Sequence, residues 1–200
     1  METFTYKEIL QQPACWIKEY EVLLEEKTRI QAFLEKYLTN ETDIVLTGAG
    51  TSAFIGDAIA PLLRGVWKNV RAVATTDIVT NAADYLAADK PLLLISFARS
   101  GNSPESVAAV NLANAICKNV AHIYITCNKN GHLAKSANAE NILSLLLPEE
   151  TDDKSLAMTS SFSTMLLTCL MISQIDHIEA ERERIEAVAA NAQAILSDYA

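Results

Sequence analysis

Three short stretches of the sequence concentrate glycines and hydroxyl side chains, the groups that can hold an anion without a metal ion. They cover residues 47–53 (TGAGTSA), 96–105 (SFARSGNSPE) and 158–164 (MTSSFST). Glycines allow a tight turn close to a ligand, and hydroxyls and backbone N–H groups at a helix start donate hydrogen bonds to phosphate. The sequence therefore predicts the binding of a phosphate ester.

Residues 96–105 carry the most specific of the three patterns. Ser103 is a natural N-cap for a helix that begins at Pro104, a position where proline is favoured. Capping does not explain the rest of the stretch, and a Rossmann-type dehydrogenase needs no second hydroxyl-rich cradle at this strand. The candidate phosphate contacts here are Arg99, Ser100, Gly101, Asn102 and Ser103.

Residues 47–53 supply three more candidates, Gly50, Thr51 and Ser52. One alternative is a plain tight turn, with Thr51 or Ser52 capping the next helix. The stretch also fits the loose dinucleotide fingerprint Gly-x-Gly-x-x-Ala, so a nicotinamide-dependent oxidoreductase is a further alternative. Such a protein needs an acidic residue at the end of the second strand, and here Asp77 comes a few residues late.

Residues 158–164 open a long apolar segment and contribute Thr159 and Ser160 as candidates. Hydroxyl residues in this position also cap helices or bond back to carbonyls one turn earlier. The sequence supports the two interpretations equally.

The elements that position these stretches follow from the hydrophobic pattern. Short apolar runs predict strands at 43–47, 70–74, 92–96, 122–126 and 142–147. Helical spacing predicts helices over 5–38, 53–64, 104–116, 157–175 and 178–196, with a short helix or irregular turn at 77–86. Thr5 and Glu8 have the spacing of a capping box at the start of the first helix.

Alternation of short buried strands with helices predicts an α/β fold. We expect a three-layer αβα sandwich with a five-stranded parallel sheet, flavodoxin-like or Rossmann-like in its winding. Ligands of such folds bind at the carboxyl ends of the strands, and all three hydroxyl-rich stretches follow a strand or open a helix at that edge.

Length, charge and cysteine usage limit the kind of protein. Two hundred residues with uninterrupted patterning indicate one large domain. The formal net charge of −9 disfavours a nucleic-acid partner. Four separated cysteines without a Cys-x-x-Cys pair, and three histidines without metal-site spacing, indicate a reduced cytoplasmic protein with no metal and no cofactor.

Residues 156–175 contain no charged side chain and are about as long as a membrane span. The hydroxyl and amide side chains within them favour a buried helix of a soluble protein, so no membrane partner is expected. The N-terminus has no basic region followed by an apolar run, and no secretory signal is predicted.

These residues resemble a known family, the SIS (sugar isomerase) domain of phosphosugar proteins. The resemblance rests on residues 48–52 (GAGTS) and 100–105 (SGNSPE). Longer strings at 46–57, 75–81, 93–110, 125–128 and 157–165 are similar to one subfamily, the tagatose-6-phosphate ketose/aldose isomerase type. Its members act in galactosamine catabolism as aminosugar-phosphate deaminase/isomerases.

The resemblance implies a phosphosugar, a hexose-6-phosphate or amino-hexose-6-phosphate, at the carboxyl edge of a five-stranded parallel sheet. It assigns the phosphate to Ser52, Ser100 and Ser103 with the amides of Gly101 and Asn102, and it places Thr159 and Ser160 near the sugar ring. It also implies a homodimer or a higher homo-oligomer.

Members of the subfamily are about twice as long and carry two SIS domains. We therefore expect residues 1–40 to form a helical segment and residues 41–200 to form the first SIS domain of such a protein. The base and the ring-opening histidine of related enzymes lie beyond the first SIS domain, so the catalytic residues stay unassigned. Asp152 and Asp153 are interpreted as solvated loop charges, and neither is taken as the base.

Three hypotheses follow. The chain is the phosphosugar-binding domain of an amino-sugar-phosphate isomerase or deaminase, converting galactosamine-6-phosphate to tagatose-6-phosphate or catalysing a related aldose–ketose isomerisation. Alternatively it is a non-catalytic, regulatory phosphosugar-binding module. The third is a dinucleotide-dependent oxidoreductase.

Overall fold

A computed structural model describes residues 3–199, apart from the side chain of Tyr199, and its centre is a sheet of parallel strands. The strands are β1 (Asp43–Gly48), β2 (Val70–Ala72), β3 (Leu92–Ala98), β4 (Val120–Thr126) and β5 (Ile142–Leu146). Their order in the sheet is β2-β1-β3-β4-β5, and every neighbouring pair is parallel. The predicted five-stranded α/β fold is confirmed, with the strand order of the flavodoxin-like winding.

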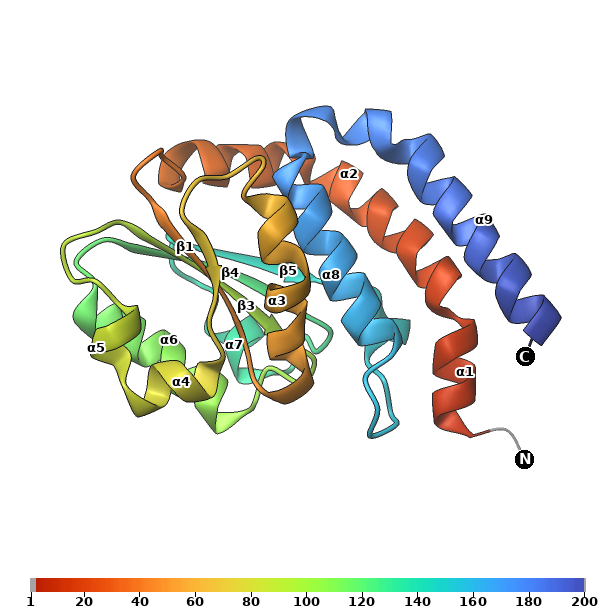
Figure 1. Cartoon of the computed structure of the whole chain (residues 1–200), viewed down its shortest axis with the longest axis horizontal. Coiled ribbons are helices and arrows are strands. Elements are labelled where there is room, and N and C mark those ends of the chain that lie inside the picture. Colours follow the sequence, from red (N-terminus) through yellow and green to blue (C-terminus); the bar gives the residue numbers. More distant parts are fainter. Residues whose placement is uncertain (1–2, 200) are drawn as a thin grey trace.

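Helices cover both faces of the sheet (Figure 1). One face packs against α2 (Gln12–Tyr37), α3 (Ala53–Leu63) and α8 (Ser160–Ser173), with α9 (Arg182–Tyr199) outside them against α2. The other face carries α4 (Thr75–Thr80), α5 (Ala82–Tyr85), α6 (Pro104–Ile116) and α7 (His132–Lys135). Alternate residues of each strand feed one core or the other, as for Leu93 and Leu94 of β3. This alternation explains why the central strands are apolar along most of their length.

The N-terminal helix is broken where one continuous helix was predicted. It consists of α1 (Phe4–Leu10) and α2, which meet at Gln11. Pro13 lies in the first turn of α2, where a backbone N–H has no hydrogen-bond acceptor within the helix, so the lack of an N–H in proline costs no hydrogen bond of α2. The capping-box prediction is also wrong, because α1 is capped by Thr3, whose Oγ1 accepts from the N–H of Tyr6 at 3.2 Å.

Other element bounds differ modestly from the predictions. The irregular region at 77–86 forms the two short helices α4 and α5, and α7 had no predicted counterpart. The long buried helix begins at Ser160 and not near residue 157. Short 3-10 turns, η1 (Gly50–Ser52), η2 (Glu149–Thr151) and η3 (Ile175–Glu181), join strands and helices.

The winding of the chain reverses between β1 and β3, which are neighbours in the sheet. From β1 the chain enters α3 on one face, and from β3 it enters α6 on the opposite face. The loops after these two strands therefore diverge at the carboxyl edge, and such a point is where open α/β sheets bind ligands.

Among the described residues, no helix is both long and apolar enough to cross a membrane. In the same residues, no group of three or more His, Cys, Asp or Glu side chains could hold a metal ion. Cys15, Cys117, Cys127 and Cys169 are free and buried.

Candidate functional site

The loop after β1 depends on two glycines. A Cβ atom added to Gly48 would lie 2.6 Å from the backbone carbon of Ser52, so only glycine lets the chain fold back there. Gly50 has a φ of +56°, a left-handed conformation that glycine adopts without cost. Thr75 Oγ1 donates to the Gly48 carbonyl at 3.1 Å and braces the loop from β2's side. Gly50 and Thr51 are exposed, whereas Ser52 is buried at the start of α3.

The loop after β3 is held from behind by the segment that follows β4. Asn128 Nδ2 donates to the Ser100 carbonyl at 3.1 Å, and the N–H of His132 donates to Asn102 Oδ1 at 2.9 Å. Gly101 has a φ of +64° and lies against Gly131, and a Cβ atom added to Gly131 would lie 2.4 Å from the Ser100 carbonyl oxygen. Ser100 is exposed, and within the described part of the chain its hydroxyl accepts only from the N–H of Asn102, at 3.3 Å.

The N-terminal end of α6 has no side-chain cap. Ser103 occupies the N-cap position, but its hydroxyl makes no capping hydrogen bond and lies 3.2 Å from Ser106 Oγ. Helices begin with backbone N–H groups that lack intrahelical partners and with a partial positive charge. The structure therefore presents an uncapped helix start, next to the exposed Ser100, at the point where β1 and β3 diverge.

The N-terminal end of α8 differs, because the carboxylate of Asp153 caps it. This carboxylate accepts from the N–H and hydroxyl of Ser161, at 2.9 and 2.6 Å, and from the N–H of Thr159 at 2.9 Å. It also accepts from the hydroxyls of Thr159 and Ser160. Asp153 is only 6% exposed, so the interpretation of this residue as a solvated loop charge is wrong.

Thr159 and Ser160 consequently differ from the other candidate site residues. Both hydroxyls donate to Asp153, and Ser160 is fully buried and also accepts from Gln11 Nε2 at 2.9 Å. Thr159 is half-buried and retains oxygen lone pairs that can accept from a sugar hydroxyl. In this conformation Ser160 has no access to a ligand, and its observed role is to close the start of α8.

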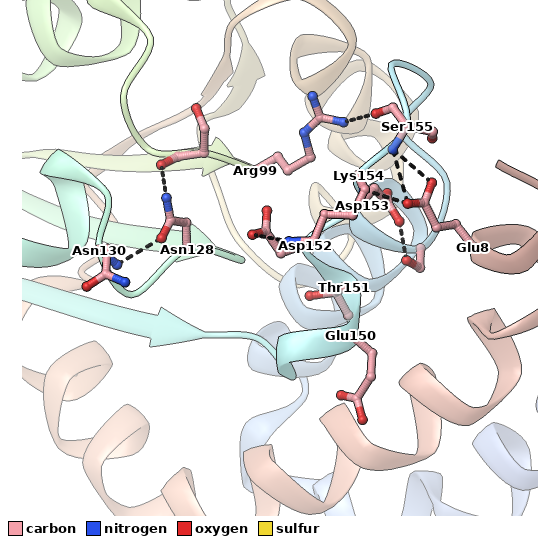
Figure 2. Close-up of polar contacts among 12 residues, drawn as sticks. Glu8, Arg99, Asn128, Asn130, Glu150, Thr151, Asp152, Asp153, Lys154 and Ser155 are labelled. Carbon is pink, nitrogen blue, oxygen red and sulfur yellow. Dashed lines mark hydrogen bonds and ion pairs between the residues drawn. The ribbon is translucent and has the colours of Figure 1, made fainter. Parts of the chain in front are cut away.

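Arg99 points toward the segment before α8. Its Nη1 donates to the carbonyl of Ser155 at 2.9 Å (Figure 2). The same segment reaches the loop after β1, because Met158 Sδ lies 3.7 Å from Ser52 Oγ. All three hydroxyl-rich stretches therefore meet at one edge of the sheet, with residues 154–158 linking the two loops.

A small polar cleft adjoins this edge at the ends of β4 and β5. Its volume is about 190 Å³, and its lining includes Asn128, Lys129, Asn130, Asp152 and Lys154. Asn128 serves the turn, since its Oδ1 accepts from the N–H of Asn130 at 2.9 Å. Burial raises the pKa of the neighbouring Cys127 thiol to about 12, which makes a thiolate nucleophile improbable there.

The structure does not favour the dinucleotide alternative. β2 ends at Ala72, and Asp77 lies exposed on the first turn of α4. The residue between them that faces the loop after β1 is Thr75, which is fully buried and bonded to Gly48. Among the residues that the structure describes, no carboxylate lies at the end of β2 to receive a ribose hydroxyl.

Two residues of this region escaped sequence reasoning. Asp153 lies too far ahead of α8 to be recognised as its cap from the local pattern, since the intervening residues loop outward. Glu8 is buried and accepts from the N–H groups of Lys154 and Ser155, which lie 146 and 147 residues further along the chain (Figure 2). No local signal in the sequence indicates either contact.

Among known proteins, residues 37–174 match the SIS domain family. The chain is 50% identical over 198 residues to D-galactosamine-6-phosphate deaminase AgaS of Escherichia coli, covering 98% of this chain and 51% of that protein. It matches the crystal structure of tagatose-6-phosphate ketose/aldose isomerase from Escherichia coli with a TM-score of 0.93 and 48% identity, over 98% of this chain and 54% of that one.

A structure described as a putative tagatose-6-phosphate ketose/aldose isomerase from Clostridium novyi NT matches with a TM-score of 0.91 and 45% identity. That match covers 96% of this chain and 50% of the other. The chain thus spans about half the length of the curated relatives it matches.

Proposed function

The chain belongs to the SIS domain family, and on that premise we propose that it binds a phosphosugar at the carboxyl edge of its sheet. The ligand is a hexose-6-phosphate or an amino-hexose-6-phosphate, the class named in the relatives at 48–50% identity. The chain serves as a phosphosugar-binding domain of an amino-sugar-phosphate isomerase or deaminase.

The observation that carries this proposal is the uncapped start of α6. A serine at an N-cap ordinarily accepts from the helix backbone, yet Ser103 does not do so here. Pro104 has no N–H, and the N–H groups of Ser106 and Val107 donate to the Ser103 carbonyl, so an anion at this point would receive the N–H of Glu105, the positive end of the helix dipole and nearby hydroxyls.

In the proposed complex the phosphate lies between the two diverging loops. Ser100 and Ser103 donate from their hydroxyls, and Gly101 and Asn102 contribute backbone amides. The loop after β1 supplies Gly50, Thr51 and Ser52 from the other side. Arg99 and Thr159 reach the sugar end of the ligand, where Thr159 acts as an acceptor.

The substitution Ser100→Ala tests the placement of the phosphate. It removes one charge-assisted hydrogen bond, and the expected loss of phosphosugar affinity is about 1.5–3 kcal/mol with unchanged stability. Isothermal titration with galactosamine 6-phosphate measures the affinity, and unsubstituted galactosamine is the control ligand. Wild-type affinity in this variant would place the phosphate elsewhere.

Thermal-shift titration separates the phosphosugar proposal from the dinucleotide alternative. Stabilisation by hexose 6-phosphate, and none by NADH or NADPH, is the expected result. Stabilisation by the nucleotide alone would overturn the proposal.

We extend the proposal to the longer protein suggested by the relatives. Residues 1–40 form a helical segment and residues 41–200 the first of two SIS domains, while the base for proton transfer lies in the second half. Assaying the 200-residue chain beside a full-length version for conversion of galactosamine 6-phosphate distinguishes this from other arrangements. Binding without turnover by the short chain supports it, whereas turnover by the short chain contradicts it. Binding without turnover by both versions would favour the non-catalytic regulatory module.

The same proposal includes a cytoplasmic location and a homo-oligomer. The support for a homo-oligomer is an apolar groove of about 580 Å³ among α3, α8 and α9, which a second copy of the chain would cover. The exposed side chains of Leu62, Val66 and Val188 border this groove. Light scattering coupled to size-exclusion chromatography measures the oligomeric state directly.

A further inference from the structure

The segment 154–158, between η2 and α8, is held by polar contacts at Lys154 and Ser155, while Met158 at its end packs against the core. Leu156 at its tip is 96% exposed, so burial of this side chain contributes nothing to fixing the segment. The segment nevertheless touches both loops of the proposed phosphosugar site, through Ser155 to Arg99 and through Met158 to Ser52. Its position therefore affects the site directly.

The contact that anchors this segment comes from α1. Glu8 is 5% exposed, and its Oε1 accepts from the N–H groups of Lys154 and Ser155, the latter at 3.1 Å. Its Oε2 lies 3.3 Å from the same Ser155 nitrogen. Hydrogen bonds from backbone N–H groups to a carboxylate are about twice as strong as neutral ones. One buried carboxylate thus fixes two successive peptide groups.

Ser155, which Glu8 holds through its N–H, also contacts Arg99. The N–H of Ser155 binds Glu8 and the carbonyl of the same residue accepts from Arg99 Nη1 (Figure 2). Arg99 follows β3 and immediately precedes the loop that carries Ser100 and Ser103. A guanidinium has five N–H donors, so Arg99 can hold this carbonyl and still donate to a ligand.

We propose that Glu8 is a positioning residue for phosphosugar binding, acting through the backbone of Ser155 on the guanidinium of Arg99. This inference rests on the proposed function and adds a residue that touches no ligand itself. Without Glu8 the Ser155 carbonyl is no longer held in place, and Arg99 loses the partner that orients it.

A double-mutant cycle tests the connection between the two residues. The variants are Glu8→Ala, Arg99→Ala and the double substitution, each titrated with galactosamine 6-phosphate by calorimetry. Each single substitution should weaken binding about tenfold, and the double substitution should also weaken it about tenfold and not about a hundredfold, because residues in one network are not additive. Additive effects would overturn the inference.

Two further variants guard against a trivial loss of folding. Glu8→Gln keeps an acceptor oxygen at the same length and should lose less affinity than Glu8→Ala. Glu25→Ala changes an exposed carboxylate of α2 and should bind as the wild type does. Hydrogen exchange should show faster exchange at residues 154 and 155 in Glu8→Gln with β3 and α6 unchanged.

The outcomes separate this inference from the proposed function. A wild-type chain that binds no galactosamine 6-phosphate overturns both. A wild-type chain that binds, with Glu8→Ala and Glu8→Gln binding equally well, overturns the positioning role alone. Loss of protection throughout the Glu8→Gln protein would show that Glu8 supports the whole fold, and this also contradicts a specific role at Arg99.

Discussion

Helices α6 and α8 both begin in serine-rich segments at the carboxyl edge of the sheet, one on each face. At α8 the hydroxyls and N–H groups converge on Asp153, an anion that belongs to the chain itself. At α6 no side chain among the described residues caps the helix, and Ser100 is exposed close to its start. The two helix starts have similar residue types. The start of α8 is occupied by the carboxylate of Asp153, whereas the start of α6 has no such carboxylate and is available to an external anion.

Removal of the internal anion should have the largest effect. The substitution Asp153→Ala leaves the buried N–H groups of Thr159 and Ser161 without acceptors, and the expected loss is about 4 kcal/mol of unfolding free energy. Urea denaturation measures it. Asp152→Ala is the matched control and should change stability by less than about 0.5 kcal/mol, because Asp152 is half-exposed and its ion pair with Lys154 is at the surface. Equal stability of the two variants would contradict the contrast between the helices.

Glu19, a second buried acidic side chain that contacts α8, has fewer hydrogen-bond donors than Asp153, and its carboxyl group is protonated more easily than an exposed one. Glu19 accepts from Thr168 Oγ1 at 2.8 Å, and its Oε2 is buried without a partner among the described residues. Burial raises its pKa from 4.5 to about 8. Between pH 4.5 and 8 the folded protein holds a proton on Glu19 that the unfolded chain has released, so protonation favours the folded state. The contribution of Glu19 to the free energy of unfolding is complete below pH 4.5 and is lost as the pH rises through 8.

Between pH 6 and pH 8 the wild type should lose about 1 kcal/mol of stability per pH unit through this group. In Glu19→Gln that share of the slope should vanish. Urea denaturation at several pH values measures the difference between the two proteins, with Glu25→Gln as an exposed control that keeps the wild-type slope. Parallel curves for wild type and Glu19→Gln would rule out a protonated Glu19.

A substitution can place a carboxylate at the start of α6, as Asp153 does at the start of α8. Ser103→Asp should cap the helix and raise stability by about 0.5–1 kcal/mol, while repelling the phosphate and weakening phosphosugar binding about thirtyfold. Ser103→Asn supplies a neutral cap and should lose much less affinity. Calorimetric titration and thermal unfolding on the same samples check both effects. Unchanged affinity in Ser103→Asp would mean that no phosphate binds at this helix.

The smallest effect concerns the glycine that shapes the open loop. Gly101→Ala should cost about 1 kcal/mol of unfolding free energy, because an alanine is strained in the left-handed conformation. The space itself is adequate, with Thr126 Oγ1 at 3.4 Å from the added Cβ as the nearest atom. Gly48→Ala, where the Cβ meets backbone at 2.6 Å, should be clearly worse in the same denaturation assay. The reverse ranking would contradict the close approach at Gly48.

Much of the fold was predictable because its signals are local. The apolar runs that form β1, β3 and β4 are bounded by turn residues, and Ser103 followed by Pro104 marks the start of α6 to the residue. The predicted helix bounds were wrong where the same local residue pattern is compatible with two structures. Pro13 could begin a helix or lie near the start of a longer one, and it begins α2.

The amino-acid sequence by itself determined the alternation of strands and helices, the parallel sheet and the three hydroxyl-rich stretches at its edge. Only the tertiary structure decided which of those hydroxyls are hydrogen-bonded to a carboxylate of the chain and which remain exposed. Asp153 folds back onto α8 across an outward loop, and Glu8 reaches Lys154 and Ser155 across 146 and 147 residues of sequence. Hydrogen bonding is short-ranged in space and indifferent to distance along the chain, so no local pattern could reveal these partners.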